Sequence, residues 1–330
     1  MCRGTQALSA RLARARDDNH RVSATPIVLD CDPGHDDAIA LLLALASPEL
    51  ELLGVTTTYG NQTLEKTTAN ALRVLELAGR TDVPVAAGAD RPLEREVVVA
   101  AHVHGESGLD GPALPQASTE PVSTDAVGWI AAAVAAAPRP VTLVPTGPLT
   151  NVARYLERHG TEGLAQIVVM GGAIAEGNMT PAAEFNIWAD PEAAALVFAA
   201  DVDVTMIGLD VTHEAVTGPE VQRRLAETGR IGTFVAELVE FFAVYHRQTY
   251  GWEGAPIHDA VTIAHLIRPG LVETKRRNVE VETVSELCRG RTVVDLWQRT
   301  DRPQNVHVGV DLDAPAFFDL LVERIGRLDA

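Results

Sequence analysis

Four aspartates stand within eight residues near the beginning of the sequence, in the segment DCDPGHDD at positions 30–37. The apolar residues 26–29 before it are typical of a buried strand, and residues 38–46 after it predict a helix. A helix N-terminus stabilises nearby anions by about 1 kcal/mol at most, which is too little to keep four close carboxylates ionised. Ca²⁺ and Mg²⁺ both take oxygen ligands from such clusters, so the segment predicts a site for a hard divalent cation.

Two other interpretations of this segment remain open. Asp36 and Asp37 could cap the following helix while Asp30 and Asp32 are solvated. An Asp-x-Asp pattern after a strand also opens Mg²⁺-dependent phosphotransferases, in which the first aspartate, here Asp30, becomes an aspartyl-phosphate. The double aspartate at 36–37 is not part of that phosphotransferase pattern.

More polar residues follow other predicted strands, where a parallel sheet places its ligand crevice. Several are of types that bind hydroxyl groups, which suits an uncharged, polyhydroxylated ligand such as ribose. A phosphate ligand would require a Gly-rich lysine loop or an arginine cluster, and the sequence has no G-x-x-x-x-G-K-[ST] motif. The polar islands contain Asn61, His104, Thr146, Asn178, Glu184, Asn186, His258 and Asp259.

Short apolar runs alternate with longer helical patterns along most of the chain. We predict strands at 26–29, 50–57, 83–86, 141–144, 167–170 and 204–207, and helices at 38–46, 63–78 and 124–137. This alternation predicts parallel strands joined by right-handed crossovers. The fold class is therefore α/β, a single domain with an open, mostly parallel sheet flanked by helices. The mostly helical segment 219–256 is expected to cap the crevice.

Composition excludes several classes of partner. The chain carries 27 Lys and Arg against 45 Asp and Glu, a net charge of −18, which argues against nucleic acid because its phosphates need a basic face. No stretch reaches the roughly 18 uncharged apolar residues of a membrane helix. Cys2, Cys31 and Cys288 are few and far apart, so we expect a reducing, cytoplasmic location. Residues 1–24 are expected to be a disordered basic extension before a domain at 25–330.

Seven ordered motifs in the chain resemble the calcium-dependent, inosine-uridine-preferring nucleoside hydrolases. Besides the first segment they lie at 60–63, 102–108, 144–151, 170–172, 184–186 and 258–259, and the similarity spans roughly residues 26–325. The resemblance implies a Rossmann-like catalytic domain that hydrolyses the N-glycosidic bond of ribonucleosides to free base and ribose. It also implies Ca²⁺ as cofactor, a homodimer or homotetramer, and a task in nucleoside salvage.

The resemblance further implies a role for each matching residue. Ca²⁺ would be held by Asp32, Asp37, the carbonyl of Thr146 and Asp259. A calcium-bound water would attack with Asp32 as general base, through an oxocarbenium-like transition state, and His258 would protonate the leaving base. The implied substrate contacts are Asp36, Asn61 and Asn186 at the ribose 2′- and 3′-hydroxyls, Asn178 and Glu184 at the 5′-hydroxyl, Met170 and Phe185 around the ribose, and His104 and Tyr245 at the base.

Two features depart from the family pattern. Residues 251–257 differ in length, which leaves base preference open. His35 stands where the family often has an apolar residue. It could add a titrating group at the rim of the site or face solvent, and of the two we expect its side chain to face solvent. A non-catalytic protein that binds calcium and nucleoside on the same scaffold is the remaining alternative, and the presence of both Asp32 and His258 argues against it.

Overall fold

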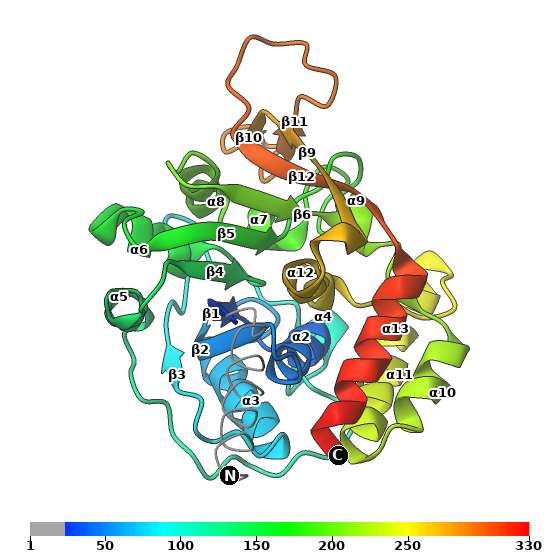
Figure 1. Ribbon diagram of the computed structural model, residues 1–330. Coiled ribbons are helices and arrows are strands. Elements are labelled where there is room, and N and C mark those ends of the chain that lie inside the picture. Colours follow the sequence, from blue (N-terminus) through cyan, green and yellow to red (C-terminus); the bar gives the residue numbers. More distant parts are fainter. Residues whose placement is uncertain (1–23, 330) are drawn as a thin grey trace, which may run out of the picture.

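The computed structural model describes residues 24–329, and its centre is an eight-stranded sheet (Figure 1). The strand order is β3-β2-β1-β4-β5-β6-β12-β9, and every pairing is parallel except that of β9 with β12. The strands are β1 (Thr25–Cys31), β2 (Leu50–Thr57), β3 (Val85–Ala87), β4 (Val141–Pro145), β5 (Leu164–Met170), β6 (Val204–Ile207), β9 (Val272–Arg277) and β12 (Val306–Leu312).

Helices cover both faces of this sheet, and each face has its own apolar core. The first core contains residues of α2 (His35–Leu45), α3 (Leu64–Leu77), α11 (Arg230–Tyr250), α12 (His258–Ile267) and α13 (Ala314–Ile325); the second contains residues of α5 (Ala126–Ala136), α6 (Thr150–His159) and α8 (Pro191–Phe198). In β1, Ile27 and Leu29 enter the first core and Val28 the second. Strands β1, β4 and β6 read as mostly apolar runs because both faces of the sheet are buried there.

The remaining elements are short. They are α4 (Ala101–His104), α7 (Phe185–Ala189), α9 (Leu209–Thr212), α10 (Pro219–Ala226), the strand pair β7 (Val216–Thr217) and β8 (Ala255–Pro256), the hairpin strands β10 (Val279–Val281) and β11 (Thr292–Val294), and the 3₁₀ turns η1 (Pro269–Leu271) and η2 (Gly326–Asp329). Among residues 24–329, no helix combines the length and the hydropathy needed to cross a bilayer. The basic extension expected before residue 25 lies outside the described residues, apart from Ala24.

The predicted α/β fold is confirmed. Each predicted strand and helix is present with its ends shifted by at most a few residues, and the predicted cap contains α10 and α11. Strands β9 to β12 were not predicted. The sequence of β9, VETKRR, is too polar to read as a strand, and it lies at the edge of the sheet, where a polar strand is tolerated.

The connections of the sheet diverge between β1 and β4. From β1 the chain proceeds to β2 and β3 on one side, whereas β4, β5 and β6 follow on the other. Asp30 in β1 pairs with Pro145 in β4, and the backbone N–H of Thr146 donates to the carbonyl of Asp30 at 2.8 Å. Ligands of open α/β sheets bind at the carboxyl ends of strands beside such a switch point. The chain therefore brings the segment after β1 and the segment after β4 to one place.

Candidate active site

A cavity opens at this edge of the sheet, and most of the residues singled out in the sequence border it. They are Asp36, Asn61, His104, Thr146, Met170, Asn178, Glu184, Phe185, Asn186, Tyr245, His258 and Asp259. Asp32 and Asp37 do not border the cavity, but both accept hydrogen bonds from Asn61, which does. The structure thus collects segments that are more than 200 residues apart in the sequence.

Three buried carboxylates meet beside the cavity, and two of them, Asp36 and Asp259, border it. Asp36, Asp37 and Asp259 each offer an oxygen within 4.8 Å of the others. Asp259 reaches this position because α12 lies beside α2. Burial, followed by repulsion from the neighbouring carboxylates, raises the pKa of Asp259, and burial likewise raises the pKa of Asp36 and Asp37. Without a cation, part of this cluster holds protons at neutral pH.

Asp32 lies beside the cluster, and only one of its two carboxylate oxygens has a hydrogen-bond partner among the described residues. Its Oδ2 accepts the backbone N–H of Asn61 at 2.6 Å, while its buried Oδ1 has no hydrogen-bond partner among the described residues. A Cβ atom at Gly60 or Gly147 would collide with this carboxylate, so glycine is needed at both positions. An unpartnered buried oxygen next to three carboxylates is a donor set that fits a hard divalent cation.

Asp37 has a capping role as well as a place in the cluster. One oxygen accepts the backbone N–H of Gly34 at 3.1 Å, which closes the first turn of α2, and the other accepts the hydroxyl of Thr146 at 2.9 Å. The side chain of Asn61 donates to the first of these oxygens, Oδ2, at 2.9 Å. The capping interpretation of the sequence is therefore correct for Asp37, but its other half is wrong, because Asp30 and Asp32 are buried rather than solvated.

One wall of the cavity is formed by the residues around α7. Glu184 caps this helix, since its carboxylate accepts the backbone N–H groups of Asn186 at 2.9 Å and Ile187 at 3.2 Å, and it also accepts the N–H of Gly172 at 2.9 Å. Burial raises the pKa of Glu184 to about 7. Asn186 donates to the carbonyl of Thr146 at 2.7 Å, and Asn178 accepts the backbone N–H of Phe185 at 2.9 Å. The carbonyl of Thr146 keeps a second lone pair for another partner.

The opposite wall is aromatic and comes from α4, α11 and the segment after it. Tyr245 lies there with three further lining residues that the sequence analysis missed, His246, Tyr250 and Trp252. Tyr250 stacks on Trp252 with ring centroids 4.8 Å apart, and His246 stacks on Trp252 at 5.8 Å. The run FFAVYHRQTYGW at 241–252 was a usable signal, because so many aromatic rings on a cap helix predict a flat ligand.

His258 begins α12 at the junction of these two walls. Its Nδ1 lies 2.7 Å from the hydroxyl of Thr212 in α9. Burial lowers the pKa of His258 well below its usual range. His213, another lining residue absent from the sequence predictions, has its ring centroid 5.7 Å from that of His258.

Comparison with known proteins decides the family. Residues 27–319 match the profile of the family described as inosine-uridine preferring nucleoside hydrolase. The chain belongs to this family. The nucleoside hydrolase therefore cleaves the N-glycosidic bond of ribonucleosides, as the resemblance implied, and neither the phosphotransferase nor the non-catalytic interpretation stands.

Relatives of this nucleoside hydrolase cover nearly its whole length. It is 53% identical over 304 residues to the pyrimidine-specific ribonucleoside hydrolase RihA of Shewanella sp. (strain MR-4), covering 91% of this chain and 96% of that one. The protein of that name from Salmonella typhimurium is also 53% identical, over 306 residues, with 92% and 98% covered. The purine-preferring ribonucleoside hydrolase of Gardnerella vaginalis superimposes with a TM-score of 0.86 at 32% identity, covering 92% of this chain and 99% of that one.

The expectation that His35 faces solvent is wrong. In this nucleoside hydrolase its side chain is fully buried, and its Nδ1 lies 3.1 Å from Nδ1 of His104. Every residue of α2 from His35 to Ala44 is buried, because the helix is enclosed by the sheet, α11 and α12. Such a helix has no solvent-facing side on which a polar residue could lie.

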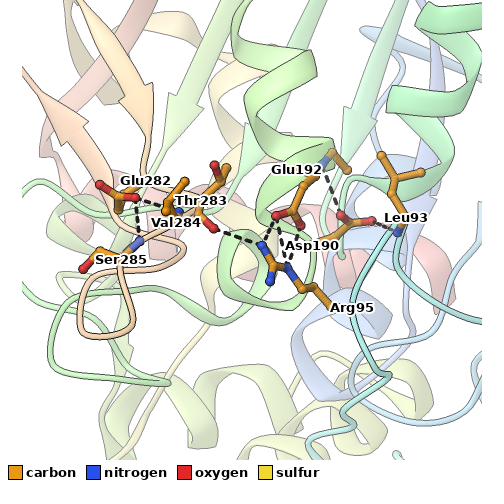
Figure 2. Close-up of polar contacts among 9 residues, drawn as sticks. Leu93, Arg95, Asp190, Glu192, Glu282, Thr283, Val284 and Ser285 are labelled. Carbon is orange, nitrogen blue, oxygen red and sulfur yellow. Dashed lines mark hydrogen bonds and ion pairs between the residues drawn. The ribbon is translucent and has the colours of Figure 1, made fainter.

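A polar network outside the cavity ties together segments that lead to both walls (Figure 2). Arg95 pairs with Glu192 in the first turn of α8 and donates to the carbonyl of Thr283 at 2.9 Å. Nearby, the backbone N–H of Leu93 donates to Asp190 at 2.9 Å. The segment held in this way continues into α4, while α8 directly follows α7. The network therefore connects the segment that leads to the aromatic wall of this nucleoside hydrolase with the helix that follows the α7 wall.

Proposed function

We propose that this nucleoside hydrolase acts on pyrimidine ribonucleosides and uses Ca²⁺. The observation that carries the pyrimidine assignment is the 53% identity, over 91% of the chain, to a relative named as pyrimidine-specific. The purine-preferring structural relative shares the fold but only 32% of the aligned residues. We assign base preference to the aromatic wall. Its residues come from α4, α11 and the segment after α11 rather than from the loops that follow the strands of the sheet.

The residues that would hold the ion are Asp32, Asp37, the carbonyl of Thr146, and Asp259. This set is supported by burial, by the free Oδ1 of Asp32 and by an oxygen-only donor chemistry. Asp36 lies within the same cluster, so it is near enough to share its charge. When bound, Ca²⁺ would supply positive charge that keeps these carboxylates ionised and makes a neighbouring water more acidic.

In this mechanism Asp32 is the general base. The hydrogen bond from the backbone of Asn61 to Oδ2 fixes the plane of its carboxylate and leaves Oδ1 to take the proton of the attacking water. As the C–N bond breaks, positive charge develops on the ribose, and the buried carboxylates below it stabilise that charge.

The ribose would be held by polar side chains from three segments. Asp36, Asn61 and Asn186 are proposed to bind its 2′- and 3′-hydroxyls, and Asn178 and Glu184 its 5′-hydroxyl. Met170 and Phe185 would border the sugar with apolar surface. This placement is supported by the hydrogen bonds that already fix Asn61, Asn178 and Asn186, since prearranged polar groups lose little freedom when a ligand binds.

His258 is proposed to protonate the leaving base, with His104 and Tyr245 contacting it. Thr212 holds Nδ1 of His258. The cationic ring would give its Nε2 proton to the departing base and return to the neutral form that burial favours, which avoids release of a poor anion.

A substrate panel tests both assignments. Uridine, cytidine, inosine, adenosine and guanosine are incubated with the enzyme in Ca²⁺ and, separately, after chelation, and free ribose is measured. We expect ribose from uridine and cytidine well above the purine nucleosides, with loss of activity on chelation and recovery on adding Ca²⁺. Faster release from inosine would overturn the pyrimidine assignment, and full activity in chelator would overturn the metal assignment.

We also propose that the chain forms a homodimer or homotetramer in the cytoplasm and takes part in nucleoside salvage. Exposed apolar side chains around the β10–β11 hairpin support self-association, with Val284, Leu287 and Trp297 exposed by 89%, 84% and 78%. Light scattering on the eluting protein measures the oligomer directly, and a monomer would contradict this part of the proposal.

A further inference from the structure

His35 and His104 form a buried pair next to the base side of the cavity, and the proposed mechanism gives His35 no task. Nε2 of His35 lies 2.8 Å from the backbone carbonyl of Asp110, and the two Nδ1 atoms are 3.1 Å apart. Phe242 packs against both rings, with centroids 5.3 Å from His35 and 5.1 Å from His104. His35 has 0% exposure, so water does not replace these partners.

The hydrogen-bond chemistry of this pair fixes where the protons are. A carbonyl oxygen accepts and never donates, so Nε2 of His35 carries a hydrogen. The ring is fully buried, and its two nitrogens meet a backbone carbonyl and another imidazole rather than a carboxylate, so a charged ring is unfavourable and Nδ1 keeps a lone pair. That lone pair faces Nδ1 of His104, which must therefore carry a hydrogen and donate it.

The arrangement in which Nδ1 of His104 accepts a hydrogen bond is unfavourable. The backbone N–H of His35 also points to Nδ1 of His104, at 3.4 Å, a long distance for a hydrogen bond. If that contact were the real bond, Nδ1 of His104 would have a lone pair, and two lone pairs would face each other at 3.1 Å. The shorter contacts therefore decide the tautomer.

The partners of the pair are themselves held in place. The carboxylate of Asp110 accepts the backbone N–H groups of Glu106 and Ser107, at 2.9 and 3.1 Å, which orders the loop that presents the Asp110 carbonyl. On the other side, a Cβ atom at Gly34 would come within 2.5 Å of Nδ1 of His104, so the ring lies directly against the backbone. His104 has little freedom to turn.

We propose that His35 is a positioning residue for the hydrolysis, holding a hydrogen on Nδ1 of His104 so that Nε2 is the atom presented to the nucleobase. Nε2 of His104 has no hydrogen-bond partner among the described residues, and its ring borders the cavity. A neutral ring accepts a hydrogen bond from the base at Nε2. A ring protonated at Nε2 donates to the departing base, and His35 accepts from Nδ1 in both cases. The inference rests on the proposed contact between His104 and the base.

The test compares two substitutions of His35. His35→Phe keeps an aromatic ring beside Phe241 and Phe242 but has no acceptor, whereas the side-chain oxygen of His35→Asn lies near the original Nδ1. Each variant is assayed with uridine and with 4-nitrophenyl β-D-riboside. The leaving group of this second substrate is a stable anion that needs no protonation, and it is not a nucleobase that His104 would have to bind. Thermal unfolding is recorded for both variants.

We expect His35→Phe to lose about tenfold or more in kcat/KM with uridine, in line with loss of a buried hydrogen bond, and clearly less with the aryl riboside. His35→Asn should recover most of the uridine activity. Equal losses on both substrates, or no recovery in His35→Asn, would overturn the inference. His104→Ala separates it from the proposed function: uridine activity that survives His104→Ala contradicts the base contact itself, whereas loss in His104→Ala with full activity in His35→Phe contradicts the role of His35 alone.

Discussion

Asn61 donates its backbone N–H to Oδ2 of Asp32 across 2.6 Å, while Oδ1 of the same carboxylate has no partner among the described residues. The two oxygens of one side chain are therefore unequal. One is fixed by the backbone of the loop after β2, and the other is available for a cation, a water or a proton. This asymmetry is what a carboxylate needs if it is to act as a base in a fixed orientation.

Replacing Asp32 by Asn tests this role. Asp32→Asn keeps the shape and an acceptor for Asn61 but cannot take up a proton, so we expect kcat to fall roughly 10²- to 10⁴-fold. The far-UV spectrum should stay unchanged. Ribose release measured under saturating Ca²⁺ and uridine reports the loss, and turnover within a few-fold of the unaltered enzyme would remove Asp32 from the role of base.

Gly34 offers a second test, because the backbone there lies against two side chains of the cavity. A Cβ at this position would meet Nδ1 of His104 at 2.5 Å and Nδ2 of Asn61 at 2.7 Å. Gly34→Ala should displace both and lower kcat/KM about 10²-fold, the usual cost of a displacement near 1 Å. Gly270→Ala is the matched control, since Gly270 has open space around it. Similar activity of the two variants would show that the crowding at Gly34 is relieved elsewhere.

Stability of the chelated protein should depend on pH. Burial raises the pKa of Asp30 to about 6 and that of Glu184 to about 7, above the 3.8 and 4.5 of the free side chains. The folded protein therefore binds protons that the unfolded chain has lost, and its stability falls as pH rises from about 4.5 to 7.

Thermal unfolding in chelator at pH 5.5 and 7.5 measures this effect, and we expect the lower melting temperature at pH 7.5. Glu184→Gln has no titrating group at this position, so the difference between the two pH values should shrink. Excess Ca²⁺ should raise the melting temperature at pH 7.5, because an ion that binds only the folded state stabilises it. A pH dependence that Glu184→Gln leaves unaltered would mean that this carboxylate ionises normally.

The contact between Arg95 and Glu192 makes a prediction about substrate binding. Arg95→Met keeps the length of the side chain but loses the ion pair and the bond to Thr283, so the segment before α4 is held less firmly. We expect KM for uridine to rise about three- to tenfold with a smaller change in kcat, since the chemical groups are untouched. Arg91→Met removes a well-exposed pair with Asp90 and is the control. Equal KM values in both variants would contradict the role of the network.

Much of the site was predictable because parallel strands end at one edge. Asp32 after β1, Asn61 after β2, Thr146 after β4 and Met170 at the end of β5 all lie where short apolar runs stop, so their meeting follows from the sheet alone. Asp259 does not follow a strand of the eight-stranded sheet. Its place depends on α12 packing beside α2, and although the sequence marked it as one of the polar islands, only the resemblance to the family indicated its role at the ion.

The orientation of His35 could not be predicted, for a physical reason. An amphipathic helix reveals its buried face by periodicity, whereas α2 is apolar at every position after Asp37 because it is buried on all sides. Nothing in the sequence around His35 indicates that Phe241 and Phe242 of α11 enclose it. His246 was missed in the same way, since its place on the cavity is set by how the cap packs, and His213 was missed because it follows the short helix α9.

The two walls of the cavity have different origins in the fold. The ribose and ion residues lie on loops anchored to the sheet and on α2, α7 and α12, while the aromatic wall comes from α4 and α11, which are outside the sheet. Under the proposed contact between this wall and the base, we expect exchange of residues 243–252 between nucleoside hydrolases to alter base preference while the ion and ribose residues, and Phe241 and Phe242 against His35, stay in place.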